Sequence, residues 1–404
     1  MQKSQARKDA SHPWAKELKV ALIHDFLLYP GGAERVLEVL AEMFPEAPIY
    51  TLLYDPEKMR GKFSGKDIRV SYLQKFPKFL RKRYQWLLPL FLVVPETFDL
   101  RDFDLVISSS GAWSKGIVTK LNTIHIAYIH SPMRFVWDYN ERYLKEQGQK
   151  KICLLKRFIL SYARLWDRLA ADRPDYLIAN SKYTQERIKK YYRRESTVIY
   201  PPAYIDVVAR SEAARQSRSN KDSVITPGSL DFARDEEKFF LVVSRLSPYK
   251  KVDVAVEAFN KLELPLVVIG EGKQEKYLKL IARGNIQILG WQNDETVERY
   301  YSGARAFIFP AEDDFGITMV EAMSHGIPVI AYGKGGAIEI VQEAVTGEFF
   351  HAQTPEVLAD GVRRFMEKEK KYDKEKIRKK AEEFSKEKFK KEFREFVNHI
   401  TYNV

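Results

Sequence analysis

Two acids flank a turn late in the sequence, at what reads as the start of a helix. Asp313 and Glu321 lie on either side of a Phe-Gly pair in AEDDFGITMVEAMSHG. An apolar, strand-like run precedes this stretch, and the residues after it have helical spacing. Backbone N–H groups from Gly316 to Thr318 can therefore face a phosphate or a developing oxyanion. The alternative is that Asp313 or Asp314 caps the helix and that Glu321 is an ordinary surface acid.

A pair of cations follows another apolar run. Arg245 and Lys250 lie in VVSRLSPYKK, directly after a strand-like stretch. Two cations at the carboxyl end of a strand can clamp a diphosphate, Arg through its planar fork and Lys as a point charge. Solvated loop charges are the alternative, because Lys251 shows that this loop tolerates charge.

Two further stretches in the first half could contact a ligand. Gly31 and Gly32 separate a strand-like run from a helical one in HDFLLYPGGAERVL, where a backbone can approach an anion closely. The full G-x-G-x-x-G pattern is absent, so a turn that merely folds is equally open. His130 ends another apolar run and could bind a hydroxyl or a phosphate. A structural histidine is the alternative, and we predict no metal site because no second ligand lies at metal-binding spacing.

Elements that could position these residues alternate along the chain. Short apolar runs such as KVALIHDF, DLVISSS and IHIAYIH alternate with helical segments, and the pattern resumes after a polar, serine-rich stretch with FFLVVSRL, PLVVIG and ARAFIFPA. Runs of this kind are typical of parallel strands that are buried on both faces. We predict an α/β protein with two doubly wound, Rossmann-like domains facing a cleft. The expected organisation is a disordered lead (1–16), a first domain (17–207), a linker (208–236), a second domain (237–375) and a carboxy-terminal helix packing back toward the first domain (376–404).

Composition narrows the class of protein. The chain has 404 residues, 45% of them hydrophobic, and one cysteine, so it can fill more than one core but cannot form an internal disulfide. The formal net charge of +12 favours anionic partners. Basic and aromatic residues interleave over 74–95, which predicts either a segment that settles on anionic lipid or a core helix with one solvated face. The charged carboxy-terminal tail has helical spacing, so we expect a packed helix and no nucleic-acid partner.

Taken together, these stretches resemble the retaining glycosyltransferases of family 4, which have the GT-B fold. The resemblance runs from about residue 18 to about residue 397 and is most specific in SRLSPYK, GWQNDETVERYYSGARAFIFPAEDDFGITMVEAMSHGIPVIA and GGAIEIV. HDFLLYPGGAERV and YIHSPMRFVWDYNERY resemble the branch of bacterial mannosyltransferases that use GDP-mannose to build O-antigen and exopolysaccharide.

The resemblance implies roles for residues that match the family motifs. It assigns Arg245 and Lys250 to the donor diphosphate, Glu321 to the nucleotide ribose and His130 to the reacting sugar. Asp313 stands where the family has a glutamate that contacts the sugar hydroxyls, so its arm is one methylene shorter. The remaining implied donor-binding residues are Gly31, Gly32, Phe315, Gly316, Ile317 and Thr318.

The implied function is transfer of a hexose, with retention and without a metal or other cofactor. The expected donor is GDP-mannose, and the expected acceptor is a hydroxyl of a lipid-linked or polysaccharide glycan. A UDP-sugar donor is an alternative, as is a non-catalytic subunit that binds nucleotide or membrane. We expect a cytoplasmic protein that can associate with the inner face of the plasma membrane.

Overall fold

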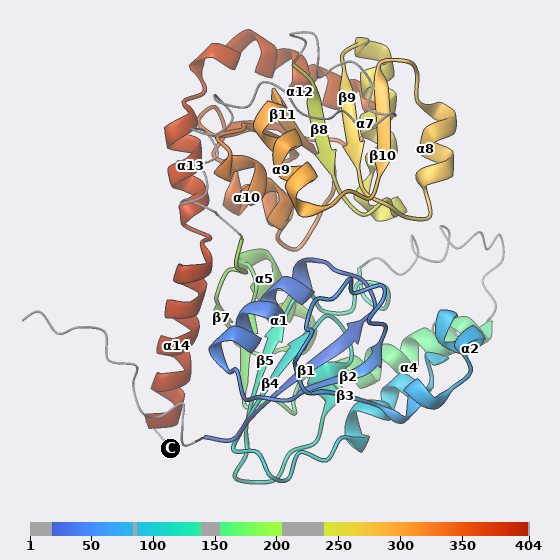
Figure 1. Cartoon of the computed structure of the whole chain (residues 1–404), viewed down its shortest axis with the longest axis vertical. Helices are drawn as coiled ribbons and strands as arrows, with labels where there is room; N and C mark the ends of the chain where they lie inside the picture. The colour runs from blue at the N-terminus through green and yellow to red at the C-terminus, as the bar shows by residue number, and fades with distance from the viewer. Residues whose placement is uncertain (1–17, 84–86, 139–153, 204–237, 403–404) are drawn as a thin grey trace, which may run out of the picture. The chain divides into compact units, whose positions relative to one another are not determined.

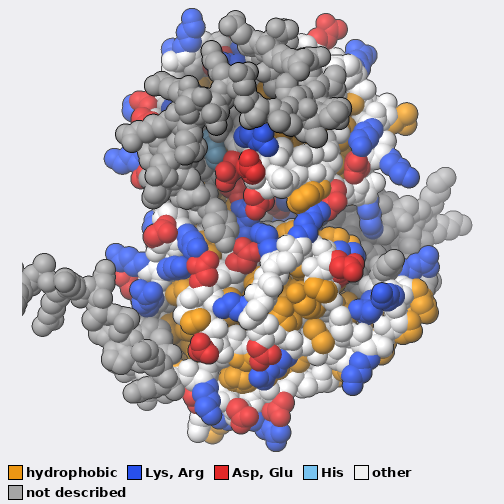
Figure 2. Space-filling model, viewed as in Figure 1, with side chains coloured by type: hydrophobic (Ala, Val, Ile, Leu, Met, Phe, Trp, Pro, Cys, Tyr) orange, Lys and Arg blue, Asp and Glu red, His pale blue; other side chains and the backbone are white. Residues whose placement is uncertain are grey.

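The computed structural model describes residues 18–83, 87–138, 154–203 and 238–402. It divides the chain into two compact units (Figure 1). The amino-terminal unit comprises Met1–Asn180 and Thr184–Val198, and the carboxy-terminal unit comprises Ser181–Tyr183 and Ile199–Val404. The predicted lead and linker lie outside the described residues. Side chains of both charge signs are scattered among hydrophobic ones on the face shown in Figure 2.

A seven-stranded parallel sheet forms the centre of the amino-terminal unit, in the order β3-β2-β1-β4-β5-β6-β7. Its strands are β1 (Val20–Leu27), β2 (Ile49–Tyr54), β3 (Ile68–Val70), β4 (Leu105–Ser110), β5 (Ile124–Ile129), β6 (Tyr176–Ala179) and β7 (Thr197–Val198). The helices are α1 (Gly32–Met43), α2 (Lys78–Lys82), α4 (Leu154–Ala170) and α5 (Lys182–Tyr192), with short 3₁₀ turns η2 (Tyr72–Lys75), η4 (Leu90–Leu92), η5 (Val94–Thr97) and η6 (Ser114–Gly116). The central strands β1 and β4 are buried except at Phe26, as expected for parallel strands covered on both faces.

A six-stranded parallel sheet forms the centre of the carboxy-terminal unit, in the order β10-β9-β8-β11-β12-β13. Its strands are β8 (Phe240–Val243), β9 (Leu266–Ile269), β10 (Ile286–Gly290), β11 (Ala306–Phe309), β12 (Val329–Tyr332) and β13 (Gly347–Phe350). The helical segments are η8 (Pro248–Lys250), α7 (Val252–Leu262), α8 (Glu275–Ile281), α9 (Asp294–Gly303), α10 (Ile317–Ser324), α11 (Ala337–Ile340), α12 (Pro355–Lys368), η9 (Glu369–Lys371), α13 (Lys374–Glu382) and α14 (Lys386–Tyr402).

Successive strand residues of this second sheet enter two different cores. Leu241 and Phe307 pack with α10 and α13, whereas their neighbours Phe240 and Ile308 pack with α7 and α12. This alternation follows from the two-residue period of a strand, so apolar residues at consecutive positions place a hydrophobic layer on each face. The two parallel sheets, each associated with helices, confirm the predicted α/β fold class.

Both sheets reverse their strand order at one point. In the amino-terminal unit the reversal lies between β1 and β4, and in the carboxy-terminal unit it lies between β8 and β11. Loops that leave two such strands in opposite directions open a crevice at the carboxyl ends, where doubly wound proteins bind their ligands. The side chains at these two places are therefore the first to consider as functional residues.

Candidate functional site

An ion pair spans the strand reversal of the carboxy-terminal unit. Lys250, at the end of η8 after β8, donates from Nζ to Oδ2 of Asp313, which follows β11. Both side chains are largely shielded, with 16% and 19% of their surface exposed. Burial alone lowers the pKa of Lys250, but the charges of Asp313 and Tyr249 and the hydrogen bond to Asp313 together outweigh burial and leave that pKa raised. Lys250 therefore stays charged at neutral pH, with its ammonium group at the crevice.

Arg245 lies on the same loop and is exposed. Its charge acts on Lys250 in the direction that lowers the pKa of the lysine, so the two cations share one electrostatic environment. This loop packs against the loop that follows β9, where the φ of Gly270 is +138°. A β-carbon added to Gly270 would lie 1.9 Å from the carbonyl oxygen of Ser244, so only glycine permits this approach.

The turn before α10 has a left-handed glycine. Gly316 is the residue before the helix, with φ of +102°, and no side chain caps the helix there. The N-cap residue is therefore Gly316, and not Asp313 or Asp314. The helix begins at Ile317 and includes Thr318, so the expected row of N–H groups starts at the predicted place.

A second glycine pair holds this turn from behind. The N–H of Gly336 donates to the carbonyl oxygen of Asp313 over 2.9 Å. A β-carbon on Gly335 would lie 2.3 Å from that oxygen, and one on Gly336 would lie 2.4 Å from the Cα of Phe315. The GGAIEIV motif therefore has a structural explanation, which is that its glycines let one loop lie against the backbone of the other.

Glu321 is buried, with 8% of its surface exposed, so it is not an ordinary surface acid. Tyr301 of α9 donates its hydroxyl to Oε2 of Glu321 over 3.1 Å, and the Tyr301 ring stacks on His325 with 5.4 Å between ring centroids. The carboxylate is therefore fixed one helical turn beyond the helix start. Sequence reasoning did not identify Tyr301.

The predicted glycine pair of the amino-terminal unit lies at the start of α1. Gly31 precedes the helix and accepts from the N–H of Arg35 over 3.1 Å, and Gly32 is the first helical residue. The backbone of Gly31 is extended, with φ of −167°, a conformation that any residue adopts. Its proposed approach to a ligand therefore stays a prediction.

His130, just beyond β5, ends a chain of polar side chains that crosses the strand reversal of this unit. Its Nε2 lies 2.8 Å from Oγ of Ser109 on β4. The same Oγ lies 3.1 Å from Nδ1 of His24 on β1, and Nε2 of His24 lies 3.5 Å from Oε1 of Glu34 on α1. Sequence reasoning singled out only His130, although the polar run Ser108-Ser109-Ser110 at the end of an apolar strand was a signal.

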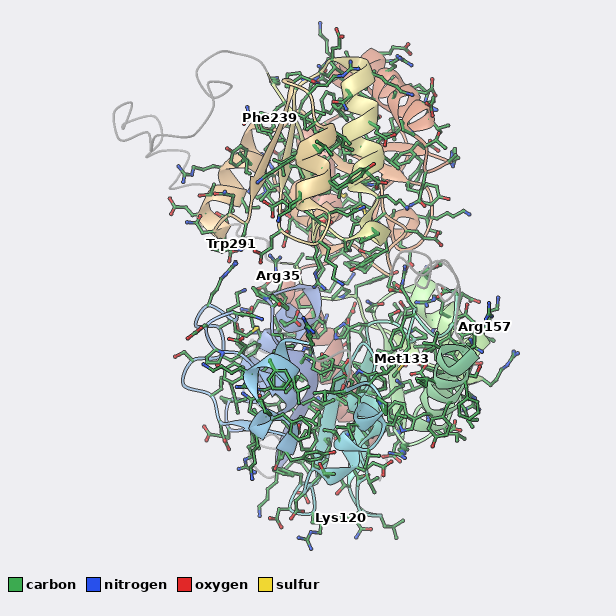
Figure 3. All side chains as sticks on the ribbon, turned by 90° about the vertical axis from the view of Figure 1, so that its right-hand side faces the viewer. Arg35, Lys120, Met133, Arg157, Phe239 and Trp291 are labelled. Carbon is green, nitrogen blue, oxygen red and sulfur yellow. The ribbon has the colours of Figure 1, made fainter. Side chains whose placement is uncertain are left out.

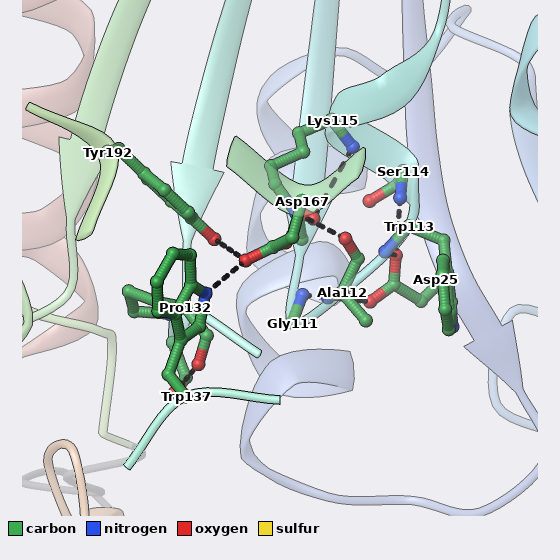
Figure 4. Close-up of polar contacts among 12 residues, drawn as sticks. Asp25, Gly111, Ala112, Trp113, Ser114, Lys115, Pro132, Trp137, Asp167 and Tyr192 are labelled. Atoms are coloured by element: carbon green, nitrogen blue, oxygen red, sulfur yellow. Dashed lines mark hydrogen bonds and ion pairs between the residues drawn. The ribbon is translucent and has the colours of Figure 1, made fainter. Parts of the chain in front are cut away.

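Asp25 fixes the loop that follows β4 (Figure 4). Its carboxylate accepts four backbone N–H groups over 2.6 to 2.9 Å, and these belong to Gly111, Ala112, Trp113 and Ser114. Two oxygens that each accept two N–H groups leave this loop little freedom. Ser109 contacts β1 through His24, and the loop after Ser109 contacts β1 through Asp25.

A buried ion pair lies beside that loop. Lys115 Nζ is 2.5 Å from Oδ1 of Asp167, with 1% and 0% of the two side chains exposed. Asp167 Oδ2 accepts from Trp137 Nε1 over 2.7 Å and from the hydroxyl of Tyr192 over 2.9 Å (Figure 4). Burial and then the Asp167 charge raise the pKa of Tyr192 well above its usual value. This network anchors the segment after His130 through Trp137.

The predicted lipid-facing stretch is divided by the structure. Leu87, Phe91 and Val94 are buried core residues, whereas Lys75 and Lys78 are exposed. Among the described residues, no helix is long and apolar enough to cross a membrane. Within all the residues that the structure describes, no three His, Cys, Asp or Glu side chains lie close enough together to hold a metal ion.

The chain matches two glycosyltransferase families. Residues 30–206 match the family described as Glycosyltransferase Family 4, and residues 231–386 match Glycosyl transferases group 1. The first match includes His130, the second includes Lys250 and Asp313, and the two do not overlap.

Individual relatives are more distant. Uncharacterized glycosyltransferase MJ1607 of Methanocaldococcus jannaschii is 32% identical over an alignment of 143 residues. The alignment covers 33% of this chain and 37% of MJ1607. Alpha-1,3/1,6-mannosyltransferase ALG2 of Dictyostelium discoideum is 22% identical, and the match covers 82% of this chain and 86% of ALG2. O-antigen chain mannosyltransferase C of Escherichia coli is 23% identical, and the match covers 78% of this chain and 80% of that protein.

Solved structures agree on the fold. HepE of Anabaena, crystallised in complex with UDP-glucose, superposes with a TM-score of 0.65 at 19% identity, over 95% of this chain and 100% of HepE. The two parallel sheets, the two family matches and this superposition agree with one another. The chain therefore belongs to the family 4 and group 1 glycosyltransferases and has their two-domain GT-B fold.

Proposed function

We propose that this glycosyltransferase moves mannose from GDP-mannose to a hydroxyl of a lipid-linked or polysaccharide glycan, with retention and without a metal. The observation that carries the proposal is the cluster at the strand reversal between β8 and β11. There Lys250 is held charged, Arg245 shares its environment, and α10 begins beside Asp313. Cations and helix-start N–H groups at one crevice suit the negative charge that develops on a departing nucleoside diphosphate.

The predicted residues of the carboxy-terminal unit bind different parts of the donor in this proposal. Arg245 and Lys250 bind the diphosphate, and N–H groups from Gly316 to Thr318 lie near its oxygens. Glu321, fixed by Tyr301, accepts hydrogen bonds from the ribose. Asp313 releases Lys250 to the diphosphate and turns to the sugar hydroxyls.

The mannose assignment is supported by two relatives that are named for mannosyl transfer, ALG2 and O-antigen chain mannosyltransferase C. A screen of GDP-, UDP- and ADP-sugars, with released nucleotide as the readout, tests it. We expect GDP-mannose to be turned over fastest and GDP to raise the melting temperature most. Turnover of a UDP-sugar instead would replace the donor, and stabilisation by none of the three nucleotides would contradict the whole proposal.

The anomeric outcome needs its own measurement. In the proposed reaction the leaving phosphate accepts the acceptor proton while the acceptor oxygen attacks from the same face of the sugar. NMR of the product formed from GDP-α-mannose should show an α-linkage. A β-linked product would exclude retention, and full activity in excess chelator is the expected result for a metal-independent enzyme.

We extend the proposal to an anionic membrane surface, which would give access to a lipid-linked acceptor at the inner face of the plasma membrane. The supporting observation is an apolar stripe on the outside of α4. Its residues recur at helical spacing and are exposed by 71%, 54%, 55% and 56%: Phe158, Tyr162, Leu165 and Leu169. Exposed Arg157 lies at the start of the stripe (Figure 3). An apolar helix face beside cations is typical of a segment that settles into lipid headgroups.

Vesicle flotation tests this surface. We expect the protein to float with phosphatidylglycerol vesicles, and a variant with Phe158→Ser, Leu165→Ser and Leu169→Ser to float much less. Leu280→Ser is the control, because Leu280 is 81% exposed but lies on α8 in the other unit. Equal flotation of the wild type and the triple variant would contradict a membrane role for α4.

A further inference from the structure

The polar chain from Glu34 to His130 lies wholly within the amino-terminal unit. It joins four elements, because Glu34 lies on α1, His24 on β1, Ser109 on β4 and His130 just beyond β5. His24 and Ser109 are 2% and 0% exposed, so both are shielded from bulk water. The protein groups themselves must therefore satisfy one another.

The donor and acceptor chemistry of the chain restricts its protons. Glu34 is an ionised acceptor in the first turn of α1, and a carboxylate disfavours a lone pair on the nitrogen that faces it. An uncharged His24 therefore places its proton on Nε2, 3.5 Å from Glu34, and its Nδ1 becomes an acceptor. The single hydroxyl proton of Ser109 is then donated to His24 Nδ1 over 3.1 Å.

The same hydroxyl can only accept on its other side. His130 Nε2 lies 2.8 Å from Ser109 Oγ, so this nitrogen must carry a proton to make the contact. An uncharged His130 then has no proton on Nδ1, so that nitrogen can only accept a proton or a hydrogen bond. Glu34, which is three contacts away from His130, therefore selects one tautomer of His130.

We propose that Glu34, His24 and Ser109 are positioning residues that fix His130 in the tautomer with its proton on Nε2. The proposal rests on the role of His130 at the reacting sugar, but the tautomer itself is a property of the protein without substrate. Its measurement can therefore fail or succeed independently of the transferase assignment. Partners behind a functional histidine commonly select its tautomer and ring orientation in this way.

The unit also contains a matched control. Ser108 Oγ lies 2.8 Å from Nε2 of His125, the same distance as between Ser109 and His130. Ser108 precedes Ser109 on β4 and points to the other face of the sheet, because successive strand residues alternate. Ser108→Ala therefore removes an equivalent buried Ser–His contact that has no connection with His130.

Nitrogen NMR of the full chain, labelled with 15N-histidine at about pH 8, above the usual histidine pKa of about 6.5, measures the tautomer directly. We expect His130 to show a protonated Nε2 and an unprotonated Nδ1, with the signals assigned from their loss in His130→Gln. Ser109→Ala should shift both signals toward a mixture of tautomers, and Ser108→Ala should leave them unchanged. A protonated Nδ1 in the wild type, or an unchanged pattern in Ser109→Ala, would overturn the proposal.

Turnover gives the second readout. Ser109→Ala and Glu34→Ala should each lower kcat by about 10-fold with little change in donor KM. Glu34→Gln should recover part of the loss, because the amide oxygen still accepts from His24. If His130→Ala had no effect on turnover while Ser109→Ala still shifted the tautomer, the role of His130 in the reaction would be wrong and the positioning chain would stand.

Discussion

The two strand reversals of this protein place polar groups in opposite ways. At the carboxy-terminal one, Lys250 and Asp313 sit in loops, are partly exposed, and belong to short continuous motifs. At the amino-terminal one, His24 and Ser109 are buried inside the sheet and lie 85 residues apart in sequence. The same α/β architecture thus builds a charged cluster in loops of one unit and an internal polar chain in the other.

The difference teaches which measurement should respond to a mutation. When a charge with some solvent access is removed, water can partly solvate the partner that is left, so the loss should affect ligand binding and catalysis more than folding. A buried polar group has no water to replace its partner, so its loss should reduce the stability of the fold. Variants in each unit can break or sharpen this contrast.

Asp167→Asn should have the largest effect on stability, because it leaves the Lys115 ammonium buried without its counter-charge. We expect a loss of about 3 to 5 kcal/mol in the free energy of unfolding of the amino-terminal unit, measured with urea. Asp172→Asn, which breaks the exposed pair with Arg168, is the control and should cost less than about 1 kcal/mol. Similar values for the two variants would show that burial does not distinguish these acids.

Lys250→Ala should have the largest effect on catalysis in the carboxy-terminal unit. We expect kcat/KM to fall by about 100-fold to 1,000-fold, as for the loss of a group that stabilises a developing oxyanion. The free energy of unfolding should fall less than in Asp167→Asn, because both side chains of the Lys250–Asp313 pair keep some contact with solvent. Lys251→Ala is the control in the same loop and should keep most of its activity. A Lys250→Ala enzyme with wild-type turnover would refute the diphosphate assignment.

His125 provides a pH test of burial in the amino-terminal unit. Burial, followed by the charges of Arg173 and Arg194, lowers the pKa of His125 from 6.5 to about 3. The unfolded chain therefore binds a proton that the folded chain does not as the pH falls below 6.5, and stability is lost between pH 6.5 and about 3. The slope should reach about 1.4 kcal/mol per pH unit.

His125→Gln removes this titration and should flatten the slope by about that amount in urea unfolding measured at several pH values. His351→Gln, on the carboxy-terminal unit, is the control and should keep the wild-type slope. An unchanged slope in His125→Gln would mean that His125 takes up its proton at an ordinary pH.

Asp313→Glu should have the smallest effect. The longer arm keeps the charge beside Lys250 but must bend to make the same contact, so we expect kcat/KM to fall by less than about 10-fold, or about 1.4 kcal/mol. Asp313→Asn, which removes the charge that holds Lys250, should cost more. A Glu variant less active than the Asn variant would mean that side-chain length matters more than charge at this position.

Prediction from sequence succeeded where a signal was local. Runs such as KVALIHDF and ARAFIFPA became β1 and β11 because a strand buried on both faces needs continuous apolar residues. Strands β2, β3 and β13 were not identified. β3 has three residues, none of them fully buried, and such a short edge strand carries little hydrophobic pattern.

The sequence by itself determined the fold class, the family and the composition of the proposed donor site, because these depend on residues that are neighbours in the chain. Only the tertiary structure decided that Lys250 pairs with Asp313, 63 residues away, and that Gly335 and Gly336 lie against the backbone after β11. It also decided the partners of His130. Parallel strands that are adjacent in a sheet are separated by whole helices in the chain, so contacts between their ends leave no spacing that a sequence pattern can show.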